Sequence, residues 1–336
     1  MQGLAEQTHN EALYGGRLTI DLDAIAANWR ALENRLEGES ECAATIKANA
    51  YGTGLCEAGQ RLYAEGCRTF FVAVPIEAVE LRRVLPDANI YALDGLFPGT
   101  AELLVDHAIR PGLGSLEELQ EWAYFCTSAG RSFPAAVHVD TGIHRLGLAP
   151  DAFASALADP RLLGSFTPSL LMSHLACGST PDHTMNRRQL DLFAEVTAPF
   201  SHIPRSLANS AGVLMGLDYH FDLVRPGISL FGGKAIDTEP NTMQPVAKVE
   251  ARIMLVRDVP EGDTIGYSAR QTAQRPLRNA VVAAGYADGL PRALSGTGAV
   301  YHAGVRLPIV GRVSMDSIII DVSALPKDTL TLGSLV

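Results

Sequence analysis

The feature that most constrains this chain is a strict alternation of short apolar runs and amphipathic stretches between residues 42 and 235. The apolar runs predict strands, and the stretches between them, whose apolar residues recur at helical spacing, predict helices. The predicted strands are CAATIKA, TFFVAV, NIYALDG, IRPGLG, AAVHVDTG, SLLMSHLA, RSLANSA and FDLVRPG. Alternating strands and helices form parallel sheets, and eight such units are what a closed (β/α)8 barrel requires. A doubly wound open sheet is the alternative, but it usually has fewer strands.

The chain changes character after residue 238, where extended runs with Gly, Pro and Asp turns replace the alternation. We therefore expect an N-terminal tail over 1–15, a barrel over 16–238 and a smaller all-β domain over 239–336. The segment RLTIDLDAIAANWRALENRL predicts a strand and a helix ahead of the barrel strands. These either complete the second domain or plug one end of the barrel.

Charge and cysteine content exclude several functional classes. The net charge of −10 argues against nucleic acid and against an anionic membrane surface as partners. The five cysteines form no CxxC pair, so neither a disulfide framework nor a metal site is indicated. The chain shows no signal-peptide pattern and no apolar run long enough to span a bilayer, so we expect a cytoplasmic protein.

Polar residues follow the predicted strands at their carboxyl ends, where the active sites of (β/α)8 barrels lie. They include Lys47, the run from Asp140 to Arg145, His174, Asn209, Ser210 and Arg225, and Gly227 and Ile228 follow Arg225 shortly after. Lys47 is one of only four lysines, and it follows an apolar strand. A desolvated lysine becomes a competent amine nucleophile. A strand-end lysine that reaches into water is the alternative.

The predicted ends of the seventh and eighth strands, ANSAG and RPGIS, have the position of the usual phosphate site of such barrels. Gly227 would let backbone N–H groups approach an anion, and a short helix after it would point its positive end at a phosphate. A reactive lysine facing a phosphate site implies a phosphorylated aldehyde. Pyridoxal phosphate (PLP) fits as a cofactor, and the sugar phosphate of a Schiff-base aldolase fits nearly as well.

Eight stretches of the chain together resemble the bacterial alanine racemases. In order, they are IKANAYGTG, HVDTGIHRLGL, SHLACG, ANSAG, VRPGISLFG, IGYSA, AAGYADGLPR and IVGRVSMDSIIIDV. The resemblance implies a PLP-binding (β/α)8 barrel, a C-terminal β-domain, and interconversion of L- and D-alanine that supplies D-alanine for peptidoglycan. It also implies a head-to-tail homodimer, in which the partner's β-domain completes each active site.

The resemblance also implies a role for each matching residue. Lys47 would hold PLP covalently; Tyr51, Asn209, Ser210, Gly227 and Ile228 would bind its phosphate; His174 would lie beneath the pyridine ring; Arg225 would contact the ring nitrogen; Arg145 and Met315 would bind the substrate carboxylate; and Tyr286 and Asp316 would line the entrance. Racemisation needs a proton carrier on each face of the α-carbon, and the resemblance implies Lys47 and Tyr267. The usual pKa of tyrosine, near 10, is high for a base, so a nearby cation must lower it.

The chain departs from the family pattern at three places. His138 stands where many members have a lysine, often carbamylated, that supports the substrate-binding arginine; Arg145 would then be oriented by Asp140 or by a bound anion. Thr53 replaces a histidine that is common in the family. The chain ends at Val336, where the family continues, so we expect a β-domain truncated at its C-terminus.

Two alternative functions remain open. One is a serine or broad-specificity racemase, and the other is a PLP-binding homologue with reduced or no turnover.

Overall fold

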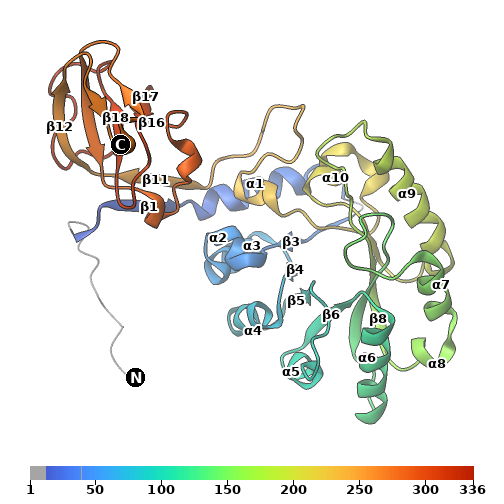
Figure 1. The fold of residues 1–336 in the computed structure, drawn as a ribbon. Helices are drawn as coiled ribbons and strands as arrows, with labels where there is room; N and C mark the ends of the chain where they lie inside the picture. Colours follow the sequence, from blue (N-terminus) through green and yellow to red (C-terminus); the bar gives the residue numbers. More distant parts are fainter. Residues whose placement is uncertain (1–12, 39) are drawn as a thin grey trace, which may run out of the picture. The chain divides into compact units, whose positions relative to one another are not determined.

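The computed structural model describes residues 13–38 and 40–336, which divide into two compact units (Figure 1). One unit comprises Ile20–Ala247, and the other comprises residues 13–19 together with Lys248–Val336. Of the N-terminal tail expected over residues 1–15, residues 1–12 lie outside the described part of the chain.

The strands of the larger unit close into a parallel barrel. Strands β3 to β9 form one parallel sheet in chain order, and β10 pairs with β2. Backbone bonds from Arg225 N to Ala208 O (2.9 Å) and from Ala43 N to Val224 O (3.0 Å) complete the ring. The bounds are β2 (Glu41–Cys42), β3 (Ala44–Thr45), β4 (Thr69–Val72), β5 (Asn89–Ala92), β6 (Ile109–Leu113), β7 (Pro134–His138), β8 (Thr167–Met172), β9 (Arg205–Ser206) and β10 (Leu223–Val224). The predicted barrel fold is confirmed.

Helices follow the strands, and local sequence signals set where several of them begin. Ser115 and Glu118 form a capping box at the start of α6, and proline occupies the first turn of α4, α7 and α8. The bounds are α1 (Leu22–Glu33), α2 (Lys47–Gly52), α3 (Leu55–Glu65), α4 (Pro75–Val84), α5 (Ala101–Asp106), α6 (Leu116–Ser128), α7 (Pro150–Ala158), α8 (Pro160–Leu163), α9 (Thr184–Thr197) and α10 (Ser210–Met215), with short 3-10 helices η2 (Ala198–Phe200), η3 (Leu217–Tyr219) and η4 (Ile228–Phe231). None of the helices within residues 13–38 and 40–336 is long and apolar enough to cross a bilayer.

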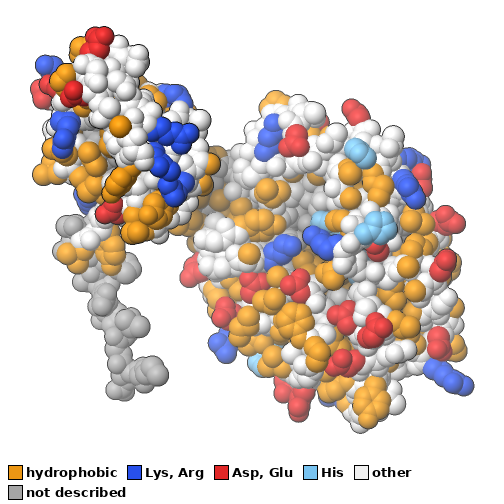
Figure 2. All heavy atoms as spheres, in the orientation of Figure 1, with side chains coloured by type: hydrophobic (Ala, Val, Ile, Leu, Met, Phe, Trp, Pro, Cys, Tyr) orange, Lys and Arg blue, Asp and Glu red, His pale blue; other side chains and the backbone are white. Residues whose placement is uncertain are grey.

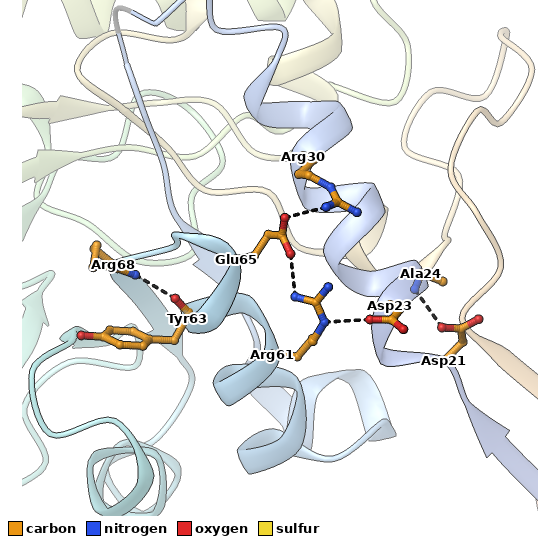
Figure 3. A network of polar contacts seen from close by, with 8 residues as sticks. All are labelled: Asp21, Asp23, Ala24, Arg30, Arg61, Tyr63, Glu65 and Arg68. Carbon is orange, nitrogen blue, oxygen red and sulfur yellow. Dashed lines mark hydrogen bonds and ion pairs between the residues drawn. The ribbon is translucent and has the colours of Figure 1, made fainter.

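An ion-pair network joins α1 to α3 at the surface (Figure 3). The carboxylate of Glu65 accepts hydrogen bonds from Arg30 (2.7 Å) and Arg61 (2.6 Å), and Nε of Arg61 donates to Asp23 (2.9 Å). Exposed ion pairs add little to stability on their own. These three ion pairs share the Glu65 carboxylate and the Arg61 guanidinium. Together they link the end of α3 to two turns of α1.

The smaller unit is built from antiparallel strands. Its main sheet has the order β12 (Ile253–Val259), β15 (Leu277–Val282), β18 (Ile318–Asp321), β17 (Val305–Val310) and β16 (Ala299–His302), and β13 (Thr264–Ile265) pairs with β14 (Gln271–Thr272). Strand β1 (Gly16–Ile20) pairs with β11 (Ala247–Ala251), so the predicted N-terminal strand does not plug the barrel. The helical segments described in this unit are single 3-10 turns, η5 (Tyr267–Ala269), η6 (Tyr286–Asp288) and η7 (Arg292–Leu294), which confirms its all-β character.

Candidate active site

A cavity of about 520 Å³ lies beyond the carboxyl ends of the barrel strands. This volume is within the range of pockets that hold cofactors and small ligands. Its lining contains every barrel residue that is expected to contact the cofactor or the substrate: Lys47, Tyr51, Arg145, His174, Asn209, Ser210, Arg225, Gly227 and Ile228. Figure 2 shows basic and histidine side chains near the middle of the larger unit, with acidic side chains scattered over the rest of the visible face.

The expected strand ends were wrong by a few residues. Lys47 opens α2 after β3 has ended at Thr45, and His174 follows β8, which ends at Met172. Ser210 is the first residue of α10, and Arg225 comes directly after β10. The apolar pattern continues past the last ladder hydrogen bond, because residues at the rim of a barrel are still buried after the strand has ended.

The residues after Lys47 form a left-handed helical turn. Ala48, Asn49, Ala50 and Tyr51 all have φ between 53° and 56°, a conformation that costs on the order of 1–2 kcal/mol per residue. Hydrogen bonds offset part of this cost: the carboxylate of Glu77 accepts from the backbone N of Asn49 (2.9 Å), and Oδ1 of Asn49 accepts from the backbone N of Leu55 (2.8 Å). The strained turn directs both Lys47 and Tyr51 to the cavity lining.

The side chain of Tyr51 extends from this turn to the loop after β10, which carries Gly227. Its ring stacks on Phe231 with centroids 4.8 Å apart, and burial raises the pKa of its hydroxyl. A Cβ atom added to Gly227 would clash with Oη of Tyr51. Gly227 is therefore required for the close approach of this tyrosine, and not for a positive φ. The short helix predicted after Gly227 is η4.

Ser210 and Asn209, at the start of α10, supply hydrogen-bond donors beside the loop that carries Gly227. Oγ of Ser210 accepts from the backbone N–H groups of Gly227 (2.9 Å) and Ser229 (3.2 Å). Two accepted bonds fill its lone pairs and leave its O–H to donate. Oδ1 of Asn209 caps α10 by accepting from the N of Gly212 (3.1 Å), so the amide NH2 is left for a ligand. Such donors suit an anion.

Arg225 is a buried cation that two carbonyls hold in place. Its guanidinium donates to the carbonyl O of Ser206 (2.9 Å) and of Ser173 (2.5 Å), and also to Oγ of Ser206. Burial lowers its pKa to about 10, so it remains charged near neutral pH. These bonds use three of its five N–H groups, which leaves donors for an acceptor in the cavity.

Two histidines in the lining, the buried His138 and the half-buried His174, are neutral at physiological pH. Burial, followed by the charges of Arg225 and Arg145, lowers the pKa of His174 to about 3. Burial and Arg225 likewise lower the pKa of His138 to about 4, although Asp140 opposes the shift. Within the described residues, Nε2 of His138 is buried without a hydrogen-bond partner. Neither ring adds a positive charge to the cavity.

These histidines predict an acid-sensitive barrel. Below pH 6.5 each imidazole takes up a proton in the unfolded chain but not in the native one, so stability falls as the pH drops from about 6.5 toward 4. Each contributes a slope of about 1.4 kcal/mol per pH unit. Urea unfolding followed by fluorescence measures this in the barrel alone, because both tryptophans, Trp29 and Trp122, are buried there. His138→Asn should remove the contribution of His138, a slope of about 1.4 kcal/mol per pH unit. An unchanged slope would contradict this prediction.

Arg145 lines the cavity with its charge unpaired. Within the part of the chain that the structure describes, its guanidinium forms no hydrogen bond or ion pair. The Asp140 carboxylate instead accepts from the backbone N–H groups of Gly142 (2.8 Å), Ile143 (2.9 Å) and His144 (3.1 Å). Burial alone would raise the pKa of Asp140, but these bonds outweigh it and lower the pKa. Asp140 thus shapes the loop and does not hold the Arg145 side chain.

Sequence reasoning missed several lining residues. Thr45 and Met172 lie at the ends of β3 and β8, and the sequence assigns a site role to neither of them nor to Lys234. Lys234 is exposed and donates to the carbonyl O of Asp237 (2.7 Å), yet it borders the same cavity as Lys47. Its position after two glycines gives no periodic signal that could have placed it there.

The remaining predicted residues lie along adjoining loops of the β-domain. Tyr267 is 69% exposed in η5, and Met315 is 59% exposed. The backbone N of Tyr286 donates to the carbonyl O of Ser314 (3.0 Å), which places the loop of Tyr286 beside that of Met315 and Asp316. Aromatic and thioether side chains with this exposure, on neighbouring loops, provide a surface that another chain could cover.

PLP matches the donor set of the barrel cavity. A phosphate requires hydrogen-bond donors, which Ser210 and Asn209 supply, and a pyridine nitrogen requires one donor, which Arg225 can supply. An aldehyde requires an amine, and Lys47 lines the same cavity. The residues present therefore fit this cofactor.

Comparison with known proteins gives one consistent result. Residues 20–235 match the family model described as alanine racemase, N-terminal domain, and residues 246–335 match alanine racemase, C-terminal domain. An alanine racemase of Methylobacterium sp. (strain 4-46) is 50% identical over 96% of this chain and 88% of its own length. A catabolic alanine racemase of Agrobacterium fabrum is 46% identical over 96% of this chain and 83% of its own length.

A solved structure extends the likeness to three dimensions. The alanine racemase of Bartonella henselae, solved with covalently bound pyridoxal phosphate, is 39% identical and superposes with a TM-score of 0.90. The match covers 96% of this chain and 89% of that chain.

Proposed function

Because the chain belongs to the alanine racemase family, we propose that it interconverts L- and D-alanine with PLP held in the barrel cavity. The observation that carries this conclusion is the composition of one cavity: an amine on Lys47, anion donors around Ser210, and two guanidinium groups, Arg225 and Arg145. The family match accounts for nearly all of the chain, including the β-domain. The protein is thus a PLP-dependent isomerase.

Each barrel residue has a distinct task in binding. We assign Lys47 to the covalent attachment of the cofactor and Tyr51, Asn209, Ser210, Gly227 and Ile228 to its phosphate. His174 would lie beneath the ring, and the guanidinium of Arg225, which Ser206 and Ser173 hold in place, would donate to the ring nitrogen. When bound, PLP withdraws electrons from the α-carbon of the substrate. Since Arg225 stays charged, it would not give up a proton to the ring nitrogen, and this would limit side reactions.

Racemisation requires proton transfer at both faces of the α-carbon. We assign Nζ of Lys47 to one face and Oη of Tyr267 to the other. Tyr267 lies in the β-domain and is largely exposed there. We propose that this exposed edge, with Met315, Tyr286 and Asp316, completes the cavity of a second copy in a head-to-tail homodimer. Met315 would then help bind the substrate carboxylate, with Tyr286 and Asp316 at the entrance.

Arg145 should bind the substrate carboxylate, because its charge is otherwise unpaired among the described residues. Arg145→Gln is expected to raise the KM for alanine about 10- to 100-fold, as loss of a charge-assisted hydrogen bond costs about 1.5–3 kcal/mol. Arg145→Lys should have a smaller effect, because it keeps the charge and loses the bidentate geometry. Steady-state kinetics in both directions measure this, and an unchanged KM in Arg145→Gln would exclude the assignment.

The experiment that tests the function is an assay of L- to D-alanine conversion by the purified chain, with L-serine and larger amino acids run in parallel. Faster conversion of alanine than of serine would support an alanine racemase. Preferred turnover of serine would point to a related racemase, and absence of turnover to a PLP-binding homologue.

We also propose a cytoplasmic protein that supplies D-alanine for peptidoglycan. All five cysteines are free, which suits a reducing compartment. The Agrobacterium relative named catabolic favours a second candidate, the breakdown of D-alanine. Deletion of the gene distinguishes the two: a D-alanine requirement for growth supports the biosynthetic role, and loss of growth on D-alanine as carbon source supports the catabolic one.

A further inference from the structure

Gln189, on helix α9, bridges two loops at the rim of the cavity without lining it. Its side chain is fully buried. Its Nε2 donates to Oγ1 of Thr141 (3.1 Å) and to the carbonyl O of His174 (2.8 Å), and its Oε1 accepts from the backbone N of Ala176 (2.8 Å). Both amide protons and one acceptor position are therefore used, and all three partners belong to loops and not to α9.

The two loops that Gln189 joins carry different parts of the site. The loop after β8 carries His174, and Ala176 also lines the cavity. The loop after β7 carries Thr141, buried and four residues before Arg145, whose guanidinium faces the cavity. In the described chain Arg145 has no direct anchor for its side chain, so its position depends on the backbone of this loop.

The contacts continue from Gln189 to the buried cation of the site. Thr141 Oγ1 and Ser173 Oγ form a hydrogen bond of 2.7 Å, in which either hydroxyl can donate. The carbonyl O of Ser173 accepts from Arg225 (2.5 Å). A single buried amide thus begins a network that reaches the loops of His174 and Arg145 and ends at Arg225. Buried networks of this kind fix geometry, because an unpaired member is costly.

We propose that Gln189 is a positioning residue that sets the spacing between the His174 loop and the Arg145 loop, and thereby the affinity of the site for the substrate carboxylate. The proposal rests on the proposed function for the identity of the substrate, but the binding of a carboxylate does not require turnover. Gln189 contributes no atom to the cavity lining, so its effect passes through Thr141 and Ala176.

The test compares Gln189→Met, which keeps the length of the side chain and removes its hydrogen bonds, with Thr197→Val on the same helix. Thr197 is equally buried, but its hydroxyl bonds only to the carbonyl of Phe193 within α9. In the PLP-loaded protein, Gln189→Met should raise the KM for alanine about 10- to 100-fold with a smaller change in kcat, because loosely held groups lose alignment. It should also weaken the binding of propionate, a carboxylate without an amine, to a similar degree in calorimetry. Thr197→Val should change neither value.

The variant Gln189→Glu adds a second test, the pH dependence of propionate affinity, which a purely structural role of Gln189 would leave unchanged. The carboxylate can accept from Ala176 but cannot donate to the carbonyl of His174, whereas the protonated acid can. Propionate affinity of this variant, relative to wild type, should therefore improve as the pH falls. If Gln189→Met keeps both its propionate affinity and its KM for alanine within about twofold of wild type, the proposal is overturned. If the wild-type chain shows no racemase activity but Gln189→Met still weakens propionate binding, the proposed function fails and the positioning role stands.

Discussion

Replacing Lys47 with alanine is expected to remove both the covalent attachment of PLP and the racemisation of alanine. Nζ of Lys47 is the amine that we assign to the cofactor and also one of the two proton carriers. Loss of a proton carrier alone reduces rates by about 10²–10⁴-fold, and loss of a nucleophile adds to this. We therefore expect activity to fall by at least about 10⁴-fold. Absorbance of the bound cofactor and a coupled D-alanine assay measure the two effects separately.

Lys234 provides the matched control, because it borders the same cavity and is also a lysine. Its Nζ is engaged with the carbonyl O of Asp237. Lys234→Ala should keep the absorbance of covalently bound PLP. If the absorbance were lost in Lys234→Ala and retained in Lys47→Ala, PLP would be attached to Lys234, and the assignment to Lys47 would be wrong.

Replacing Tyr267 with phenylalanine is expected to lower racemisation by about 10²–10⁴-fold in both directions while PLP stays attached. The substitution removes one hydroxyl and keeps the ring. Lys47 remains able to move a proton at its own face of the α-carbon. In heavy water, Tyr267→Phe should therefore exchange the α-proton of one alanine enantiomer without inverting it, and should leave the other enantiomer unexchanged. Loss of exchange from both enantiomers would show that Tyr267 is not a face-specific proton carrier.

A hybrid of the two variants tests whether the sites are shared between subunits. In a dimer of one Lys47→Ala chain and one Tyr267→Phe chain, shared sites would place both lesions in one cavity and leave the other intact. Co-expression with two affinity tags isolates this hybrid, which should recover about half of the wild-type activity. An inactive hybrid would mean that Lys47 and Tyr267 of the same chain act together.

The fold could be predicted because the patterns that produce it are periodic. Apolar runs and helical spacing from residue 42 to 235 require parallel strands with helices between them, and the loss of helical spacing afterwards marks the β-domain. Strand ends were less predictable. Apolar residues continue past the last ladder bond, so Lys47 and His174 were placed on strands that end two residues earlier.

The candidate site was predicted unevenly for the same reason. Residue type and order indicated Lys47, Arg145, Ser210 and Arg225, and family resemblance added Tyr51; all of these residues line one cavity. The left-handed turn after Lys47 has no periodic signature, since Ala48 and Ala50 usually favour right-handed helices. Gln189 was missed because a glutamine on an amphipathic helix reads as a solvent-exposed residue, whereas its partners come from distant loops.

Peptide mapping after borohydride reduction tests the central claim most directly. Reduction of the PLP-loaded protein makes the cofactor linkage permanent, and digestion followed by mass spectrometry locates it. We predict a pyridoxyl group on Lys47, in a preparation that converts L-alanine to D-alanine before reduction and not after it. A modification on Lys234, or an unmodified Lys47 in an active preparation, would contradict the account.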